Sequence, residues 1–168
     1  MMGAGKSSIG RKLATSLGIT FVDSDSQIQD ECGMPISDYF AKYGEADFRR
    51  GEARIVAKLL EKGPQVLATG GGAFCDAQIR AVVARKGISI WLKADADTLM
   101  TRVIGRRDRP MLNTSDPGEA FRRLLAQREV FYSQADLTVH LENRQRNKVI
   151  RAILDQSDAI VRVLNSRG

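Results

Sequence analysis

The chain has 168 residues, a formal net charge of +6 and an isoelectric point near 9.6. Its 43% hydrophobic and 27% charged content is typical of a globular protein, and the length suits one domain with a sizeable core. No apolar run approaches the ~18 residues that a membrane span needs, so no membrane partner is expected. The basic residues are scattered rather than gathered in a stripe, which favours a site for anionic small molecules over a nucleic-acid surface.

Cysteine usage points to the compartment. Cys32 and Cys75 are the two cysteines, and they lack the spacing of a metal site. A reduced, cytoplasmic location is therefore the natural interpretation.

The first motif is Gly3-Ala4-Gly5-Lys6-Ser7-Ser8. It is most of the phosphate-binding loop G-x-x-x-x-G-K-[ST], whose first glycine would lie one position before Met1. In such a loop the glycines let backbone N–H groups face phosphate oxygens, Lys6 brings positive charge, and the Ser7 hydroxyl can hold Mg²⁺. Taken alone, the motif can also be a chance Gly-Lys-Ser in a flexible terminus.

Helices and strands are predicted to alternate along the rest of the chain. The helices are expected at 6–17, 26–31, 36–40, 45–62, 77–86, 95–104, 119–133 and from about 147, and the strands at 19–23, 66–69, 88–92 and 137–141. This order predicts an α/β fold, a doubly wound parallel sheet with helices on both faces, in a single domain over 1–168. Ligands of such sheets bind beyond the carboxyl ends of the strands.

Two carboxylates follow the first predicted strand, in Asp23-Ser24-Asp25. If the extended conformation persists, both lie on one face, so one can meet a metal's water shell while the other accepts a substrate hydroxyl. The alternative is a solvated turn that caps the next helix.

Gly70-Gly71-Gly72 follows the second predicted strand. Three glycines allow a ligand to approach the backbone closely and leave N–H groups free to bind an anion. The alternative is a tight strand-to-helix turn, which needs fewer glycines.

Phe48-Arg49-Arg50-Gly51-Glu52 lies within a predicted helix. Arg49 and Glu52 share a face at i, i+3, so Glu52 can hold Arg49 as a planar fork for a carboxylate. A solvated surface ion pair is the alternative.

An arginine-rich stretch at about 105–118 separates two predicted helices. Such a loop can close over a nucleotide as a lid, or its charges can simply keep it solvated. Arg128, on the following helix, would need a partner if buried.

These motifs, in this order and spacing, resemble the shikimate kinase family from Gly3 to about Asn147. The marks of the resemblance are Gly3-Ala4-Gly5-Lys6-Ser7, Asp23-Ser24-Asp25, Phe48-Arg49-Arg50-x-Glu52, Gly70-Gly71-Gly72-Ala73, Arg109-Pro110-Met111-Leu112 and Arg128-x-x-x-Tyr132. The resemblance implies a P-loop kinase fold and transfer of the ATP γ-phosphoryl group to the 3-hydroxyl of shikimate, in the chorismate pathway of aromatic amino-acid biosynthesis.

The resemblance also implies residue roles. Catalysis would rest on Asp25, Lys6 and Arg109, and Mg²⁺ on Ser7 and Asp23. Nucleotide contacts would come from Gly3, Ala4, Gly5, Lys6, Ser7, Ser8, Arg102, Arg109, Pro110 and Arg144, the last chosen over Arg146. Shikimate would be bound by Asp25, Arg49, Glu52, Gly70, Gly71, Gly72 and Arg128, with the helical region 26–62 forming much of its site.

One feature departs from the family pattern. Its members have an apolar strand before the phosphate loop, at the centre of the sheet, and this sequence has none. A sheet without its central strand leaves two rows of backbone groups unpaired. The expectation is a true chain that starts upstream, with the 168-residue form insoluble or inactive when made alone.

Two other functions stay open on the sequence. One is a related small-molecule kinase, such as a gluconate kinase, which shares the phosphate loop and sheet. The other is a binding domain that keeps the scaffold without turnover. A monomer is expected for the kinase.

Overall fold

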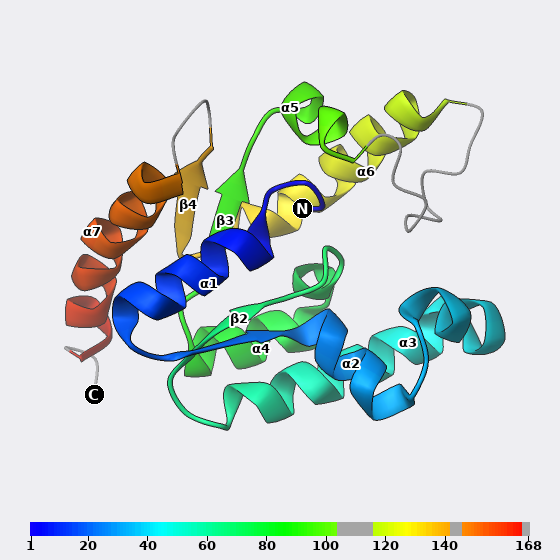
Figure 1. Ribbon diagram of the computed structural model, residues 1–168, viewed down its shortest axis with the longest axis horizontal. Coiled ribbons are helices and arrows are strands. Elements are labelled where there is room, and N and C mark those ends of the chain that lie inside the picture. Colours follow the sequence, from blue (N-terminus) through cyan, green and yellow to red (C-terminus); the bar gives the residue numbers. More distant parts are fainter. Residues whose placement is uncertain (104–115, 142–145, 166–168) are drawn as a thin grey trace.

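The computed structural model describes residues 1–103, 116–141 and 146–165, and it is an α/β fold (Figure 1). Its helices are α1 (Lys6–Leu17), α2 (Ser24–Cys32), α3 (Ile36–Leu60), η1 (Ala73–Cys75), α4 (Ala77–Lys86), α5 (Ala96–Thr101), α6 (Pro117–Tyr132) and α7 (Arg146–Asn165). Its strands are β1 (Thr20–Asp23), β2 (Gln65–Ala68), β3 (Ile90–Lys93) and β4 (Leu137–His140). The predicted alternation of helices and strands is confirmed, with α1 and α4 at their expected bounds.

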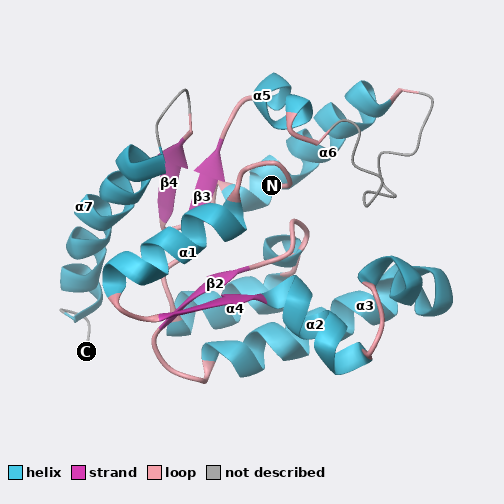
Figure 2. Ribbon diagram, in the orientation of Figure 1, coloured by secondary structure: helices cyan, strands magenta, loops and turns pink. Residues whose placement is uncertain are grey.

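The strands form two separate parallel pairs (Figure 2). β1 pairs with β2 from Thr20↔Gln65 to Asp23↔Ala68, and β3 pairs with β4 from Ile90↔Leu137 to Lys93↔His140. Within the described residues no strand pairing joins the two sheets. The parallel arrangement within each pair is as predicted, and the described residues form two half-sheets rather than one continuous sheet.

A cavity of about 810 Å³ lies between the two half-sheets. Apolar side chains from α1, β2 and β3 line much of it, among them Leu13, Val66 and Trp91. Met1, Lys6 and Gly70 lie at its border with the loops described below. The gap therefore reaches the carboxyl-end edge, where ligands of such sheets bind.

Helices cover both faces of the β1–β2 sheet, as predicted. Alternate residues of a strand point to opposite faces. Accordingly Val66 packs in the cluster that includes α1, whereas Leu67 packs against Val56 and Ile79 from α3 and α4. The second half-sheet is covered by α7, which packs on β4.

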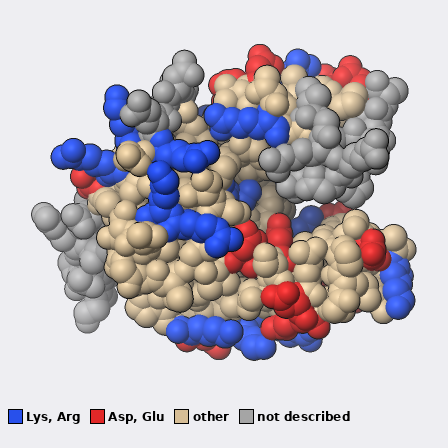
Figure 3. Space-filling view, in the orientation of Figure 1, with Lys and Arg blue, Asp and Glu red and all other residues tan. Residues whose placement is uncertain are grey.

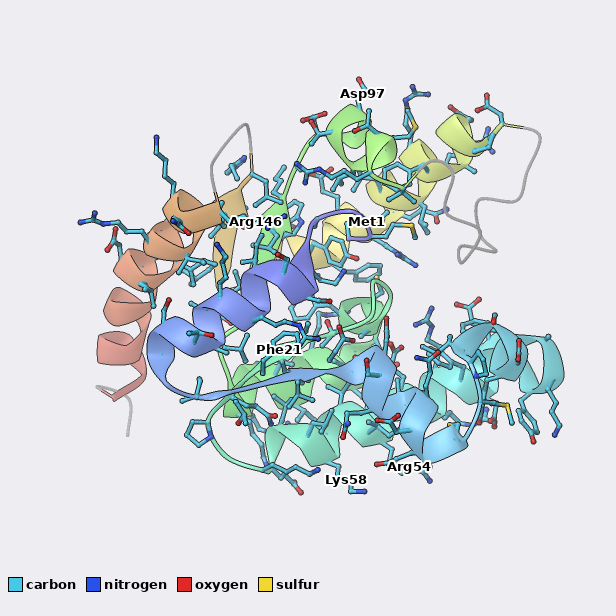
Figure 4. The ribbon with its side chains drawn as sticks, in the orientation of Figure 1. Met1, Phe21, Arg54, Lys58, Asp97 and Arg146 are labelled. Atoms are coloured by element: carbon cyan, nitrogen blue, oxygen red, sulfur yellow. The ribbon has the colours of Figure 1, made fainter. Side chains whose placement is uncertain are left out.

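The contact between α1 and β1 is unusually close. A Cβ atom built on Gly10 would lie 2.6 Å from the ring of Phe21. Phe21 lies beneath α1 in Figure 4, and the Arg11 guanidinium sits 4.6 Å from its ring centroid. This packing fixes the start of α1, and with it the phosphate loop, against the strand that carries Asp23.

α3 is one continuous element only by its hydrogen bonds. Gly44, with φ 80° and ψ 168°, is non-helical and breaks it into two segments. That break corresponds to the two helices predicted at 36–40 and 45–62. The second segment is the one that carries Arg49 and Glu52.

The arginine-rich stretch lies largely outside the described residues. Asp116 caps α6 by accepting the Glu119 N–H at 2.9 Å, and Pro117 and Gly118 are already helical. The helix predicted at 119–133 therefore begins two residues earlier, at Pro117, and ends at Tyr132. None of the helices in the described ranges has both the length and the apolar character that a membrane crossing demands.

Candidate active site

The phosphate loop leads directly into α1. Gly3 and Gly5 have φ values of 79° and 77°, which other residues rarely adopt, and Gly5 is the N-cap of the helix. The Lys6 Nζ donates to the Met1 carbonyl oxygen at 2.9 Å, so the lysine folds back over the loop. Backbone N–H groups at a helix N-terminus and an adjacent ammonium form an anion site. Met1, at the head of this loop, is labelled in Figure 4.

Arg102 also reaches this loop. Its Nη1 donates to the Gly3 carbonyl oxygen at 3.4 Å. The loop itself lies against α5, since a Cβ atom on Gly3 would be 2.8 Å from the Leu99 carbonyl oxygen. Arg102 thus lies beside the predicted nucleotide site.

Ser7 and Asp23, the predicted metal ligands, are in contact. The Ser7 hydroxyl donates to Asp23 Oδ2 at 2.7 Å, and Asp23 Oδ1 accepts the Asp25 N–H at 3.1 Å. Hydroxyl and carboxylate oxygens are the hard ligands that Mg²⁺ prefers, and kinases usually hold it by one or two carboxylates plus substrate phosphates. The pair at the foot of the phosphate loop fits that description.

Asp25 and Glu52 meet at Gly70. A Cβ atom on Gly70 would lie 2.7 Å from Asp25 Oδ1 and 2.8 Å from Glu52 Oε1, so a side chain there would displace both carboxylates. Glu52 is 1% exposed, and its Oε1 has no hydrogen-bond partner among the described residues. Burial raises the pKa of Glu52 against the opposing effect of Arg49, and Asp25 adds to the rise. A buried acceptor without a donor therefore lies next to Asp25.

Arg49 is held by two carboxylates. Its Nη1 donates to Glu52 Oε2 at 2.6 Å, while Nε and Nη2 donate to Glu45 Oε1 at 3.2 and 3.0 Å. The predicted Arg49–Glu52 contact is present, and the alternative of a solvated pair is wrong because Glu52 is buried. Both terminal nitrogens of Arg49 lie 2.6 Å from the position of a Cβ on Gly72.

Arg128 approaches the same turn from α6. It is 7% exposed, and its Nη1 lies 3.1 Å from the position of a Cβ on Gly71. Two guanidinium groups, from Arg49 and Arg128, therefore lie against successive glycines of one turn. A planar carboxylate is the ligand that such forks bind most strongly.

The structure thus gathers the predicted residues into two adjoining groups. The loop Gly3–Ser8, Arg102 and Asp23 form the first group, and Asp25, Arg49, Glu52, Gly70–Gly72 and Arg128 form the second. Arg109, Pro110 and Arg144 lie outside the described residues. In Figure 3 basic side chains gather over α1, and acidic ones lie at the start of α2.

Two residues that hold the Gly70–Gly72 turn were given no role by the sequence. Ser24 is completely buried, and its Oγ accepts the Gly70 N–H at 3.2 Å. Tyr132 donates its hydroxyl to the Gly71 carbonyl oxygen. The available signals were the serine between two aspartates and the tyrosine one helical turn after Arg128, but neither pattern identifies a partner by itself.

Curated relatives match most of the chain. A shikimate kinase of Bradyrhizobium diazoefficiens is 50% identical over 92% of this chain and 75% of its own length. One of Nitrobacter winogradskyi is 54% identical over 83% of this chain and 65% of its own length. The chain therefore spans between about two thirds and three quarters of these relatives.

Solved structures of shikimate kinases are also similar to this chain. Shikimate kinase from Acinetobacter baumannii in complex with shikimate has a TM-score of 0.89 and 33% identity, covering 94% of this chain and 89% of the other. Shikimate kinase from Aquifex aeolicus has a TM-score of 0.85 and 30% identity, covering 96% and 94%. Residues 2–158 match the profile of the family described as shikimate kinase. The chain therefore belongs to the shikimate kinase family, whose members are ATP-dependent phosphotransferases.

Proposed function

We propose that this protein transfers the γ-phosphoryl group of ATP to the 3-hydroxyl of shikimate. The observation that carries the proposal is the convergence of Asp25, Arg49 and Arg128 on the Gly70–Gly72 turn. The turn and the phosphate loop both border the same gap between the half-sheets. An acid with several hydroxyl groups fits a site made of two guanidinium groups and two carboxylates.

The phosphate loop binds the nucleotide. The N–H groups at the start of α1 and the ammonium of Lys6 neutralise the β- and γ-phosphate charge, and Arg102 borders the nucleotide. Ser7 and Asp23 would hold Mg²⁺, which would neutralise part of the phosphate charge. Arg109, Pro110 and Arg144 are further nucleotide contacts in this proposal, on the family resemblance of the sequence.

The acceptor is held at the other group. Arg49 and Arg128 bind the shikimate carboxylate, while Glu52 fixes Arg49 and presents Oε1 to a hydroxyl. Asp25 binds the reacting hydroxyl. As the hydroxyl oxygen bonds to the γ-phosphorus and the bond to the β-phosphate oxygen breaks, Asp25 takes the released proton. Because phosphoryl transfer has a loose transition state, positioning by Asp25 matters more than its strength as a base.

The protein is a cytoplasmic monomer in this proposal. Cys32 and Cys75 are both free thiols, which suits a reduced compartment. Within the described ranges the exposed large apolar side chains Leu17, Tyr43 and Val130 come from three different helices, a scatter ordinary for monomers. Light scattering after gel filtration tests the monomer.

A coupled assay of ADP release, with and without shikimate, tests the activity. Shikimate-dependent release that requires Mg²⁺ is expected. Shikimate methyl ester should be a poor substrate, because it loses charge-assisted hydrogen bonds to Arg49 and Arg128. ATP binding without turnover would indicate a binding domain, and turnover of gluconate instead of shikimate a different kinase. Equal kcat/KM for ester and acid would overturn the carboxylate assignment.

A further inference from the structure

The Gly70–Gly72 turn is held from two sides by hydroxyl groups that take no part in the reaction. On one side, the buried Ser24 Oγ accepts the Gly70 N–H at 3.2 Å. On the other, the hydroxyl of Tyr132 donates to the Gly71 carbonyl oxygen. Three glycines in a row carry no side chains that would select one conformation, so the turn depends on such external bonds.

The bond from Tyr132 fixes a peptide plane. No cis peptide bond occurs in the described residues, and in a trans peptide the C=O and the following N–H point in opposite directions. A Gly71 carbonyl that faces Tyr132 therefore directs the Gly72 N–H away from Tyr132. Within the described ranges neither the Gly71 nor the Gly72 N–H donates to a protein acceptor. The Arg49 guanidinium lies against Gly72.

Tyr132 is itself rigidly placed. It is 6% exposed, and its ring packs against Trp91 with centroids 5.9 Å apart. Burial raises the pKa of its hydroxyl to about 12, so the group remains a donor across the physiological range. Tyr132 lies four residues after Arg128 on α6. One helix therefore places both the Arg128 guanidinium and the hydroxyl that holds the Gly70–Gly72 turn.

We propose that Tyr132 is a positioning residue whose bond to the Gly71 carbonyl aims the Gly72 N–H into the acceptor site, beside Arg49. Ser24 is its counterpart at Gly70. The Gly72 N–H would donate to an anionic or hydroxyl group of the acceptor. This identification of the ligand rests on the proposed function. The anchoring of the turn does not rest on it.

The test is Tyr132→Phe, which removes the hydroxyl and keeps the ring on Trp91. We expect the KM for shikimate to rise about 3- to 10-fold, the range for one lost hydrogen bond, with the KM for ATP within about twofold of wild type. Ser133→Ala is the matched control, because it also deletes a hydroxyl that donates to a backbone carbonyl, that of Val130 at 3.0 Å on the same helix. Its KM values should be unchanged.

A second readout needs no turnover. The ¹⁵N relaxation dispersion of the Gly70–Gly72 amides should show new exchange in Tyr132→Phe and none in Ser133→Ala. If wild type does not phosphorylate shikimate, the proposed function fails while this measurement still decides the anchor. If Tyr132→Phe does not fold, Ser24→Ala should show the raised KM for shikimate and the new exchange at the Gly70–Gly72 amides. Ser24→Thr, which keeps the hydroxyl, should behave as wild type. A folded Tyr132→Phe with an unchanged KM for shikimate and no new exchange at the Gly70–Gly72 amides would overturn the proposal.

Discussion

At the scale of single residues, the charge of Asp25 decides how much it contributes to phosphoryl transfer. Its Oδ1 lies against Gly70, next to the buried Glu52, whereas Asp23 accepts the hydroxyl of Ser7 at the foot of the phosphate loop. An amide at this position keeps the shape but loses the charge and the ability to accept a proton. The roles of Asp23 and Asp25 are thus separable by substitution.

For Asp25→Asn we expect kcat to fall ~100-fold or more, within the range of losses in positioning and proton transfer. The affinity for ATP should change little. Asp97→Asn, at a side chain that is 81% exposed on α5, is the control and should behave as wild type. Near wild-type turnover by Asp25→Asn would remove Asp25 from the mechanism.

Gly72 is a residue whose missing side chain matters for function more than for stability. Its φ of −104° is open to alanine, so the backbone does not resist the substitution. The added Cβ would lie 2.6 Å from both terminal nitrogens of Arg49, the far end of a side chain that can move. The guanidinium is therefore the group that yields.

We expect Gly72→Ala to raise the KM for shikimate about tenfold or more through the displaced Arg49, and to leave the melting temperature nearly unchanged. Gly87→Ala is the matched control, because its backbone is extended and its Cβ would meet nothing closer than 3.9 Å. An unchanged KM in Gly72→Ala would place the acceptor away from Arg49.

At the scale of elements, α3 contains two glycines in different backbone conformations. The break at Gly44 needs a glycine, whereas the regular helix at Gly51 does not. Gly44 has φ 80° and ψ 168°, a region that only glycine occupies readily, and Gly51 lies in regular helix. A Cβ at either position would meet no atom within 4 Å. The two glycines therefore differ only in backbone conformation.

This difference predicts opposite signs for one substitution. Gly44→Ala should lower the free energy of unfolding by about 1–3 kcal/mol through strain. Gly51→Ala should raise it by about 0.5–1 kcal/mol, because alanine loses less chain entropy in a helix. Urea denaturation measures both, and a loss at Gly51 equal to that at Gly44 would contradict the backbone argument.

For the whole molecule, the dominant feature is the cavity of about 810 Å³ between the half-sheets. Unlike an ordinary core, it is lined by apolar groups that lack packing partners on one side. Apolar cavities in proteins bind small apolar ligands. The 168-residue chain should therefore bind a dye such as anilinonaphthalene sulfonate. The near-ultraviolet circular dichroism of Trp91 should remain, which distinguishes this binding from that of a molten globule.

Leu17→Gln should weaken dye binding, since Leu17 lines the cavity yet is 47% exposed and tolerates the change. Val130→Gln, at a residue on α6 that is 65% exposed and does not line the cavity, is its control. Equal dye affinity in both variants would mean that the dye binds elsewhere.

Local patterns in the sequence determined much of this protein. The glycines and lysine of the phosphate loop, the bounds of α1 and α4, the i, i+3 contact of Arg49 with Glu52 and the α/β class all follow from interactions within a few residues. Periodicity and capping are short-range effects, so a sequence displays them directly.

Only the tertiary structure decided which distant groups meet. The pairing of β1 with β2 brings together Asp25, Glu52 and Gly70, and it places Ser24 beside the Gly70 N–H. The packing of α6 on η1 brings the Tyr132 hydroxyl to the Gly71 carbonyl oxygen. Nothing local specifies these contacts, since they depend on how sheet and helices pack. The same reason explains why no role could be assigned to Ser24 and Tyr132 from the sequence.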